Sequence, residues 1–159
     1  MAADRLDRPQ DSPAGRFPNL GRVCVNYNLR KASRAVNQVF DATLRPTGLR
    51  ASQFAVLVAL AQTDTVTISR LARWLVMDRT TLSRNLRPLA VRGHLAIASG
   101  ADRREQEIRI TPHGEKALLN AYPYWKKAQA NISDGLGPER WKRLLETLAA
   151  TVSLARGPE

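Results

Sequence analysis

Cysteine, histidine and long apolar runs are scarce in this 159-residue sequence. The one cysteine, Cys24, excludes an internal disulfide and a cysteine-rich zinc site. The two histidines, His94 and His113, are too far apart in sequence to indicate a metal site. No apolar run approaches the roughly 20 residues that span a bilayer, and the first residues lack an apolar signal core. We therefore expect a cytoplasmic protein with no metal and no membrane span.

Signatures of catalysis and of cofactor binding are also missing. The sequence has no G-x-S-x-G nucleophile elbow, no G-x-x-x-x-G-K phosphate loop, no G-x-G-x-x-G dinucleotide fingerprint and no H-E-x-x-H zinc motif. No cysteine–histidine or paired-carboxylate arrangement has a spacing typical of catalysis. We expect neither an enzyme nor a cofactor-binding protein.

Lysine is scarce, although positive charge is abundant. Only five of the 25 basic residues are lysines, and with 14 acids the net charge is +11. The guanidinium group of arginine offers several donors in one plane, which suits contact with phosphates and with guanine. The charge indicates a polyanionic partner. The sign of the charge does not show whether that partner is a nucleic acid or an anionic membrane. A positive charge that serves only solubility is the alternative.

Apolar periodicity predicts a mainly α-helical chain with a small β-hairpin. Residues 1–17 are polar and rich in proline, aspartate and arginine, which is typical of a flexible arm. Thr67, Asp78 and Thr111 have side chains that commonly cap helix N-termini, and Gly93 is placed to end a helix. The expected helices cover 20–44, 51–61, 68–75, 78–92 (bent at Pro88), 112–133 (bent at Pro123) and 138–154, with a break at Gly135–Pro138 before the last. The expected strands cover 95–98 and 107–110.

Helices 68–75 and 78–92 followed by the hairpin have the order of a winged helix-turn-helix. The second helix places three leucines on one side and a polar set on the other. Between residues 67 and 111 there are nine arginines and four acids. We interpret this helix as one that contacts DNA. The alternative is a solvated surface helix. The polar set, which falls within about 140° of arc, consists of Arg79, Thr80, Ser83, Arg84 and Arg87.

Several stretches of the chain together resemble the MarR (multiple antibiotic resistance regulator) family of bacterial transcription factors. The most specific of these stretches is similar to that family's wing motif, and it extends from Asp102-Arg103-Arg104-Glu105 to Ile110-Thr111-Pro112-His113-Gly114. Three further stretches are Leu49–Leu60 with Gln53, Thr67–Ala72, and Arg92-Gly93-His94-Leu95. Arg50 departs from the family's pattern, because the family often has threonine at the position that caps the helix expected at 51–61.

The resemblance implies a homodimer formed by terminal helices, here residues 18–48 and 112–159. A winged helix-turn-helix at 49–111 would bind double-stranded, pseudo-palindromic promoter DNA through a recognition helix at 78–92 and a wing at 99–106. Such regulators usually repress and are released by a small aromatic or anionic effector. Apolar stripes on the terminal helices also favour symmetric pairing.

The wing residues have expected roles as well. Arg104, or alternatively Arg103, is suited to insertion into the minor groove. Asp102 is expected to shape the turn of the wing. Asp78 is first a helix cap, and the resemblance adds an ion pair with Arg104.

The resemblance also places an effector pocket between the dimerisation helices and the DNA-binding lobe. Core packing is the alternative role for each candidate, and Trp74 is expected in the core or at an interface. Cys24 is either a small buried hydrophobe or, as in one branch of the family, a peroxide sensor. The candidate pocket residues are Cys24, Tyr27, Arg30, Phe54, Trp74 and Tyr122.

Two other functions fit a basic winged helix. One is an architectural protein that binds DNA without sequence preference, and the other is a protein–protein adaptor. The intact arginine face disfavours the adaptor. A regulator would prefer the promoter beside its own gene to random DNA by about 10³-fold or more.

Overall fold

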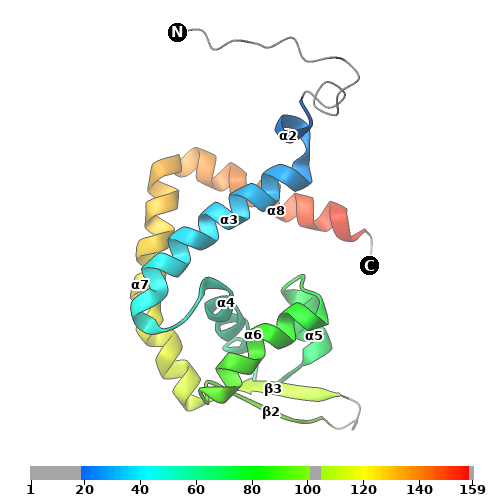
Figure 1. The fold of residues 1–159 in the computed structure, drawn as a ribbon, viewed down its shortest axis with the longest axis vertical. Helices are drawn as coiled ribbons and strands as arrows, with labels where there is room; N and C mark the ends of the chain where they lie inside the picture. Colours follow the sequence, from blue (N-terminus) through cyan, green and yellow to red (C-terminus); the bar gives the residue numbers. More distant parts are fainter. Residues whose placement is uncertain (1–18, 101–104, 158–159) are drawn as a thin grey trace, which may run out of the picture. The chain divides into compact units, whose positions relative to one another are not determined.

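The computed structural model describes residues 19–100 and 105–157 (Figure 1). The chain divides into two compact units, Met1–Gln38 and Val39–Glu159. The elements in chain order are α2 (Leu20–Val23), α3 (Val25–Leu44), the 3-10 helix η1 (Arg45–Thr47), α4 (Ala51–Leu60), β1 (Val66–Thr67), α5 (Ile68–Trp74), α6 (Arg79–Val91), β2 (Leu95–Ser99), β3 (Gln106–Ile110), α7 (Pro112–Leu136) and α8 (Pro138–Arg156).

The first unit contains α2 and most of α3, where the sequence predicted one uninterrupted helix over 20–44. That prediction is wrong at Cys24, which separates the two helices. The side-chain amide of Asn28 donates to the carbonyl oxygen of Cys24 (2.9 Å) and also reaches those of Gly21 and Arg22. Asparagine side chains compete with helical backbone bonding in this way, so Asn28 stabilises the interruption.

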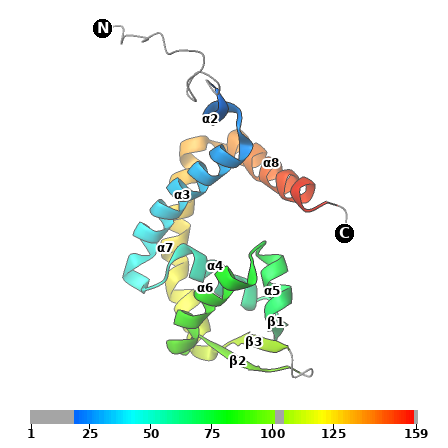
Figure 2. The same ribbon diagram turned by 45° about the vertical axis from the view of Figure 1, so that its right-hand side comes forward.

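The second unit contains an antiparallel sheet of three strands in the order β1-β3-β2, beside α5 and α6 (Figure 2). The expected hairpin is present, with Ile97 opposite Ile108. The expectation of only two strands is wrong, because Val66 pairs with Ile108 on the other side of β3. A strand of two residues is too short to show alternation in the sequence.

The core of this unit is almost entirely aliphatic. It is built from side chains of α4, α5, α6, α7 and the sheet, together with Leu44 at the end of α3 and Leu49 before α4. Phe54 is the aromatic member of the buried hydrophobic residues in the described part of the chain. The side chains that are completely or almost completely buried are Leu44, Val56, Leu57, Leu60, Leu71, Leu82, Leu86, Leu89 and Ile108.

The three expected N-caps are confirmed. Thr67 Oγ1 accepts from the backbone N–H of Arg70 (3.2 Å), Asp78 Oδ1 from that of Thr81 (2.8 Å), and Thr111 Oγ1 from that of Gly114 (3.1 Å). Each bond satisfies a backbone donor that a helix leaves unpaired in its first turn. Gly93 follows α6 with φ 70°, as expected of a C-terminal stop.

The start of α4 lacks a capping hydroxyl because Arg50 occupies the cap position. Two side chains supply acceptors instead. Gln53 Oε1 accepts from the backbone N–H of Arg50 (3.0 Å), and Asp41 Oδ1, from the end of α3, accepts from that of Ala51 (2.7 Å). The helix therefore begins at Ala51, as predicted.

Helices α7 and α8 complete the second unit. The expected break at Gly135–Pro138 is confirmed, since Gly137 separates the two helices with φ 74°, and α7 extends to Leu136, beyond its expected end at residue 133. Neither Pro88 in α6 nor Pro123 in α7 breaks its helix. None of the described helices is both long enough and apolar enough to cross a membrane.

Candidate nucleic-acid interface

Helix α6 has two chemically different faces. Leu82, Leu86 and Leu89 are at most 2% exposed and hold the helix on the core. The predicted DNA-contacting set on the opposite face is exposed at every position: Arg79, Thr80, Ser83, Arg84 and Arg87. The helix thus presents three guanidinium groups and two hydroxyls to solvent, while its leucine face is buried in the core. This is the chemistry that contact with phosphates and base edges requires.

The first turn of α6 is organised by Asp78. Its Oδ2 accepts from the Thr81 hydroxyl (2.6 Å), in addition to the capping bond at Oδ1. These bonds lower the pKa of the Asp78 carboxyl below its usual value, because they stabilise the charged form. The Thr81 hydroxyl proton is consequently engaged within the protein. The Ser83 hydroxyl donates to the Arg79 carbonyl (2.8 Å), which leaves its oxygen lone pairs free to accept from a base.

The turn between α5 and α6 contains a strained residue that the sequence did not indicate. Val76 has φ 51°, a left-handed conformation that is costly for a β-branched side chain. Backbone bonds on either side maintain it, from Val76 N–H to the Arg73 carbonyl (3.2 Å) and from Met77 N–H to the Ala72 carbonyl (2.9 Å). This turn sets the angle between the two helices, and a glycine would be the usual sequence signal for it.

The wing is described up to its tip. Gly100 N–H donates to the Glu105 carbonyl (2.8 Å), which closes the end of the β2–β3 ladder. The described residues do not include Asp102, Arg103 and Arg104. The predicted ion pair between Asp78 and Arg104 therefore also lies outside them. Their roles remain predictions.

Two hydrogen bonds join α6 to the segment before and within α4. They involve Ser52 with Asn85 and Gly48 with Arg92, pairs that are 33 and 44 residues apart. Sequence reasoning missed all four residues because no local pattern indicates pairs at such separations.

An apolar groove lies between α4 and α7 in the second unit, with a volume of about 410 Å³. Trp125 lines this groove and stacks on Phe54 (ring centroids 6.0 Å apart) and on Tyr122 (5.8 Å), which line it as well. The lining residues are Phe54, Val58, Ala61, Gln62, Leu118, Leu119, Tyr122 and Trp125. The structure therefore brings two of the predicted effector residues, Phe54 and Tyr122, together and adds Trp125, which was not among the candidate pocket residues.

The other predicted effector residues are not among those that line this groove. Trp74 does not line the groove; it is 45% exposed on α5, where the guanidinium of Arg70 lies 4.9 Å from its ring centroid. The expectation that Trp74 belongs to the core is wrong for the chain by itself. Cys24, Tyr27 and Arg30 belong to the first unit, in which Cys24 is half-buried and the other two are exposed.

The two histidines are neighbours in space. Their rings stack with centroids 4.8 Å apart at the junction of α6, β2 and α7. His94 is 9% exposed and its Nδ1 has no hydrogen-bond partner. Burial, with smaller contributions from the charges of His113 and Arg92, lowers the pKa of His94. Within residues 19–100 and 105–157 no three metal-ligating side chains cluster.

Comparison with known proteins gives one consistent result. The model of the MarR family matches residues 47–105. The crystal structure of the M. tuberculosis transcriptional regulator MosR in complex with DNA is 34% identical, covers 84% of this chain and 99% of that chain, and superposes with a TM-score of 0.73. A mutant of E. coli MarR in complex with operator DNA shares the fold at 18% identity, with a TM-score of 0.74 over 89% of this chain and 99% of that one.

A curated relative, the HTH-type regulator YwoH of Bacillus subtilis (strain 168), is 26% identical over 90 residues. The match spans 57% of this chain and 66% of YwoH, just under two thirds of that relative's length. The winged helix, its match to the family model and the similarity to MosR over nearly the whole of that protein agree. The chain belongs to the MarR family of winged-helix transcription regulators and is not an enzyme.

Proposed function

We propose that the protein is a dimeric repressor that binds pseudo-palindromic promoter DNA through α6 and the wing. The observation that carries this proposal is the exposed arginine face of α6, which has no acid after its cap and rests on a fully buried leucine face. Arg79, Arg84 and Arg87 supply the base and phosphate contacts. A regulator of this kind works at the chromosome, so we place it in the cytoplasm.

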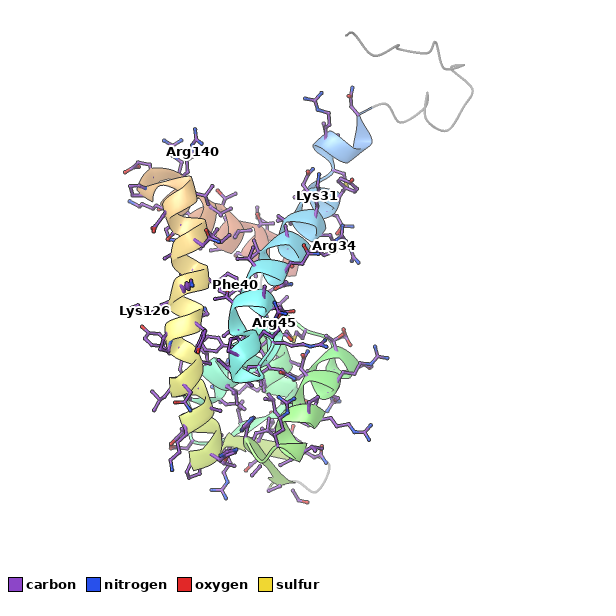
Figure 3. All side chains as sticks on the ribbon, turned by 60° about the vertical axis from the view of Figure 1, so that its left-hand side comes forward. Lys31, Arg34, Phe40, Arg45, Lys126 and Arg140 are labelled. Carbon is purple, nitrogen blue, oxygen red and sulfur yellow. The ribbon has the colours of Figure 1, made fainter. Side chains whose placement is uncertain are left out.

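Positive charge also occurs away from α6, on Lys126 of α7 and Arg140 of α8 (Figure 3). It is the combination of arginines with short hydroxyl side chains on one packed helix that favours base readout over charge alone. The MosR structure, which contains DNA, is from a protein that is 34% identical to this one and supports the same partner.

Pairing of two chains is supported by the surface of α8. None of its described residues is buried within the chain, although it carries a stripe of large apolar side chains. Leu144, Leu145, Leu148 and Val152 are 37–47% exposed. A second copy would remove this stripe from water. Two lobes on a two-fold axis then match half-sites about one helical turn apart.

The groove between α4 and α7 is the site we propose for the effector. Its lining is mostly apolar and aromatic, and the polar groups that its lining residues carry are the Gln62 amide, the Tyr122 hydroxyl and the Trp125 indole N–H. Such a surface binds a planar aromatic compound by stacking on Trp125 or Tyr122, with any charged substituent directed to solvent. Quenching of tryptophan fluorescence by aromatic acids in the wild type, and its loss in Trp125→Leu, would test this assignment.

Preference for one DNA sequence distinguishes the regulator from an architectural binder. Affinity is measured by fluorescence anisotropy for a duplex from the region upstream of the protein's own gene and for a shuffled duplex of equal length, at one salt concentration. We expect a preference of about 10³-fold or more for the promoter duplex. Equal affinity for both duplexes would favour the architectural alternative.

A further inference from the structure

Two directional contacts tie α6 to parts of the chain that precede it. Ser52 Oγ, in the first turn of α4, donates to Asn85 Oδ1 (2.8 Å). The amide nitrogen of Asn85 donates in turn to the Thr81 carbonyl of its own helix (3.1 Å), which fixes the orientation of the amide. Directly after the C-terminus of α6, Arg92 Nη1 donates to the carbonyl of Gly48. The helix is therefore held near its middle and at its C-terminus.

The segment that holds it is itself closely bonded to the end of α3. The Thr47 hydroxyl donates to the Leu44 carbonyl (2.7 Å) and accepts from the Leu49 N–H (3.2 Å). Asp41 Oδ1 accepts from the Ala51 N–H (2.7 Å), directly before Ser52. A continuous set of hydrogen bonds thus runs from the last turn of α3 to α6.

These bonds do something that apolar packing cannot. The leucine face of α6 is held by contacts that have little directional preference, so it permits small rotations about the helix axis. At a radius of about 5–6 Å, a rotation of about 20° displaces a surface side chain by roughly 2 Å. Hydrogen bonds to bases tolerate far less, since donor–acceptor distances fall within about 0.5 Å of each other. One bond at the middle of α6 and another directly after its C-terminus remove that freedom.

We propose that Ser52, Asn85 and Arg92 are positioning residues for DNA binding, which hold α6 in the orientation that DNA requires and link that orientation to the end of α3. The inference rests on the proposed function of α6. Without these bonds the binding-competent orientation becomes one of several, and the apparent affinity for DNA falls by the fraction of molecules that leave it.

Ser52→Ala is the most informative variant, because Ser52 is in α4 and outside the DNA-contacting set. We expect about tenfold weaker binding to the promoter duplex, with an unchanged salt dependence because no charge is lost. Asn85→Ala is expected to lose as much, and the double variant no more than either alone. Ser52→Thr retains the hydroxyl and is expected to bind as the wild type does. Asn120→Ala, an exposed asparagine in α7, is the matched control and should change nothing.

Arg92→Lys separates positioning from direct attraction to phosphate. It retains the charge but not the forked donors, so we expect weaker binding with the salt dependence unchanged. Each variant is assayed at a temperature at which circular dichroism shows it folded. Any of three results would overturn the inference. Ser52→Ala could bind with wild-type affinity, the double variant could show additive losses, or Arg92→Lys could change the salt dependence of binding and nothing else. If Arg84→Ala also binds as the wild type does, the proposed function fails with it; if Arg84→Ala binds weakly, only the positioning role fails.

Discussion

Gly114, in the first turn of α7, is the position where the smallest substitution should have a large effect. A Cβ atom there would lie 1.9 Å from the carbonyl oxygen of His94 and 2.9 Å from Cγ1 of Ile110. That carbonyl also accepts the N–H of Thr111 (3.1 Å), so the start of α7 is bonded to the start of β2. Gly114→Ala requires these backbones to separate by about 1 Å, because real Cβ contacts shorter than 3.0 Å essentially never occur.

Helix propensity opposes this cost. Alanine is better than glycine inside a helix by about 1 kcal/mol, whereas overpacking a rigid site costs about 1–3 kcal/mol or more. Since the clash is with backbone, we expect the upper end of that range and a net loss of about 2 kcal/mol in the free energy of unfolding. This corresponds to a fall of about 4–8 °C in Tm for a chain of this size.

Gly135→Ala is the matched control, since it lies in the same helix and a Cβ there meets nothing within 4 Å. It is expected to stabilise the protein by about 0.5–1 kcal/mol. Both variants are compared by urea unfolding at one protein concentration, monitored by circular dichroism. Equal stability of the two variants would refute the account of the α7–β2 junction.

Three further results are expected. Because the pKa of His94 is lowered in the fold, the folded state favours the neutral form, so stability is retained above about pH 6.5 and declines as the pH falls below it. The Tm measured from pH 8 to pH 5 should therefore fall less for His94→Gln than for the wild type, and an equally steep fall in Tm would contradict this role of His94. Arg104→Ala should weaken binding to most DNA sequences and reduce the salt slope by about one ion per monomer, whereas an unchanged affinity and slope would remove the wing from the interface. Truncation after Ser133 should give unfolded or aggregated protein, and the full chain should sediment as a dimer at micromolar concentration; a stable monomer would overturn the pairing of α8.

Features that depend on neighbouring residues were predicted well from the sequence. The caps at Thr67, Asp78 and Thr111 follow from one side chain and the next turn of helix, and all three are confirmed. The order of helices and strands followed from apolar periodicity, with errors at ends and interruptions and in the short strand β1. The interruption at Cys24 depends on an asparagine that competes for backbone carbonyls, which periodicity does not reveal.

Features that depend on distant residues were missed. The pairing of β1 with β3, the Ser52–Asn85 bond and the use of Asp41 as a cap join residues that local patterns do not connect. The candidate DNA-contacting face of α6 was predictable because it is a property of one helix. The effector groove was only partly predictable, because Phe54 and Trp125 come together through the packing of α4 on α7.

The most direct test of the account is the affinity of Arg84→Ala and Arg79→Ala for the promoter duplex, with Arg140→Ala in α8 as the control. Arg79 and Arg84 are exposed, so both variants should retain the wild-type melting temperature. We predict that Arg84→Ala loses about 1–3 kcal/mol of promoter binding and discriminates less between promoter and shuffled DNA, while Arg140→Ala changes neither quantity. Wild-type affinity in both Arg84→Ala and Arg79→Ala, with normal stability, would contradict the assignment of α6 as the helix that reads DNA.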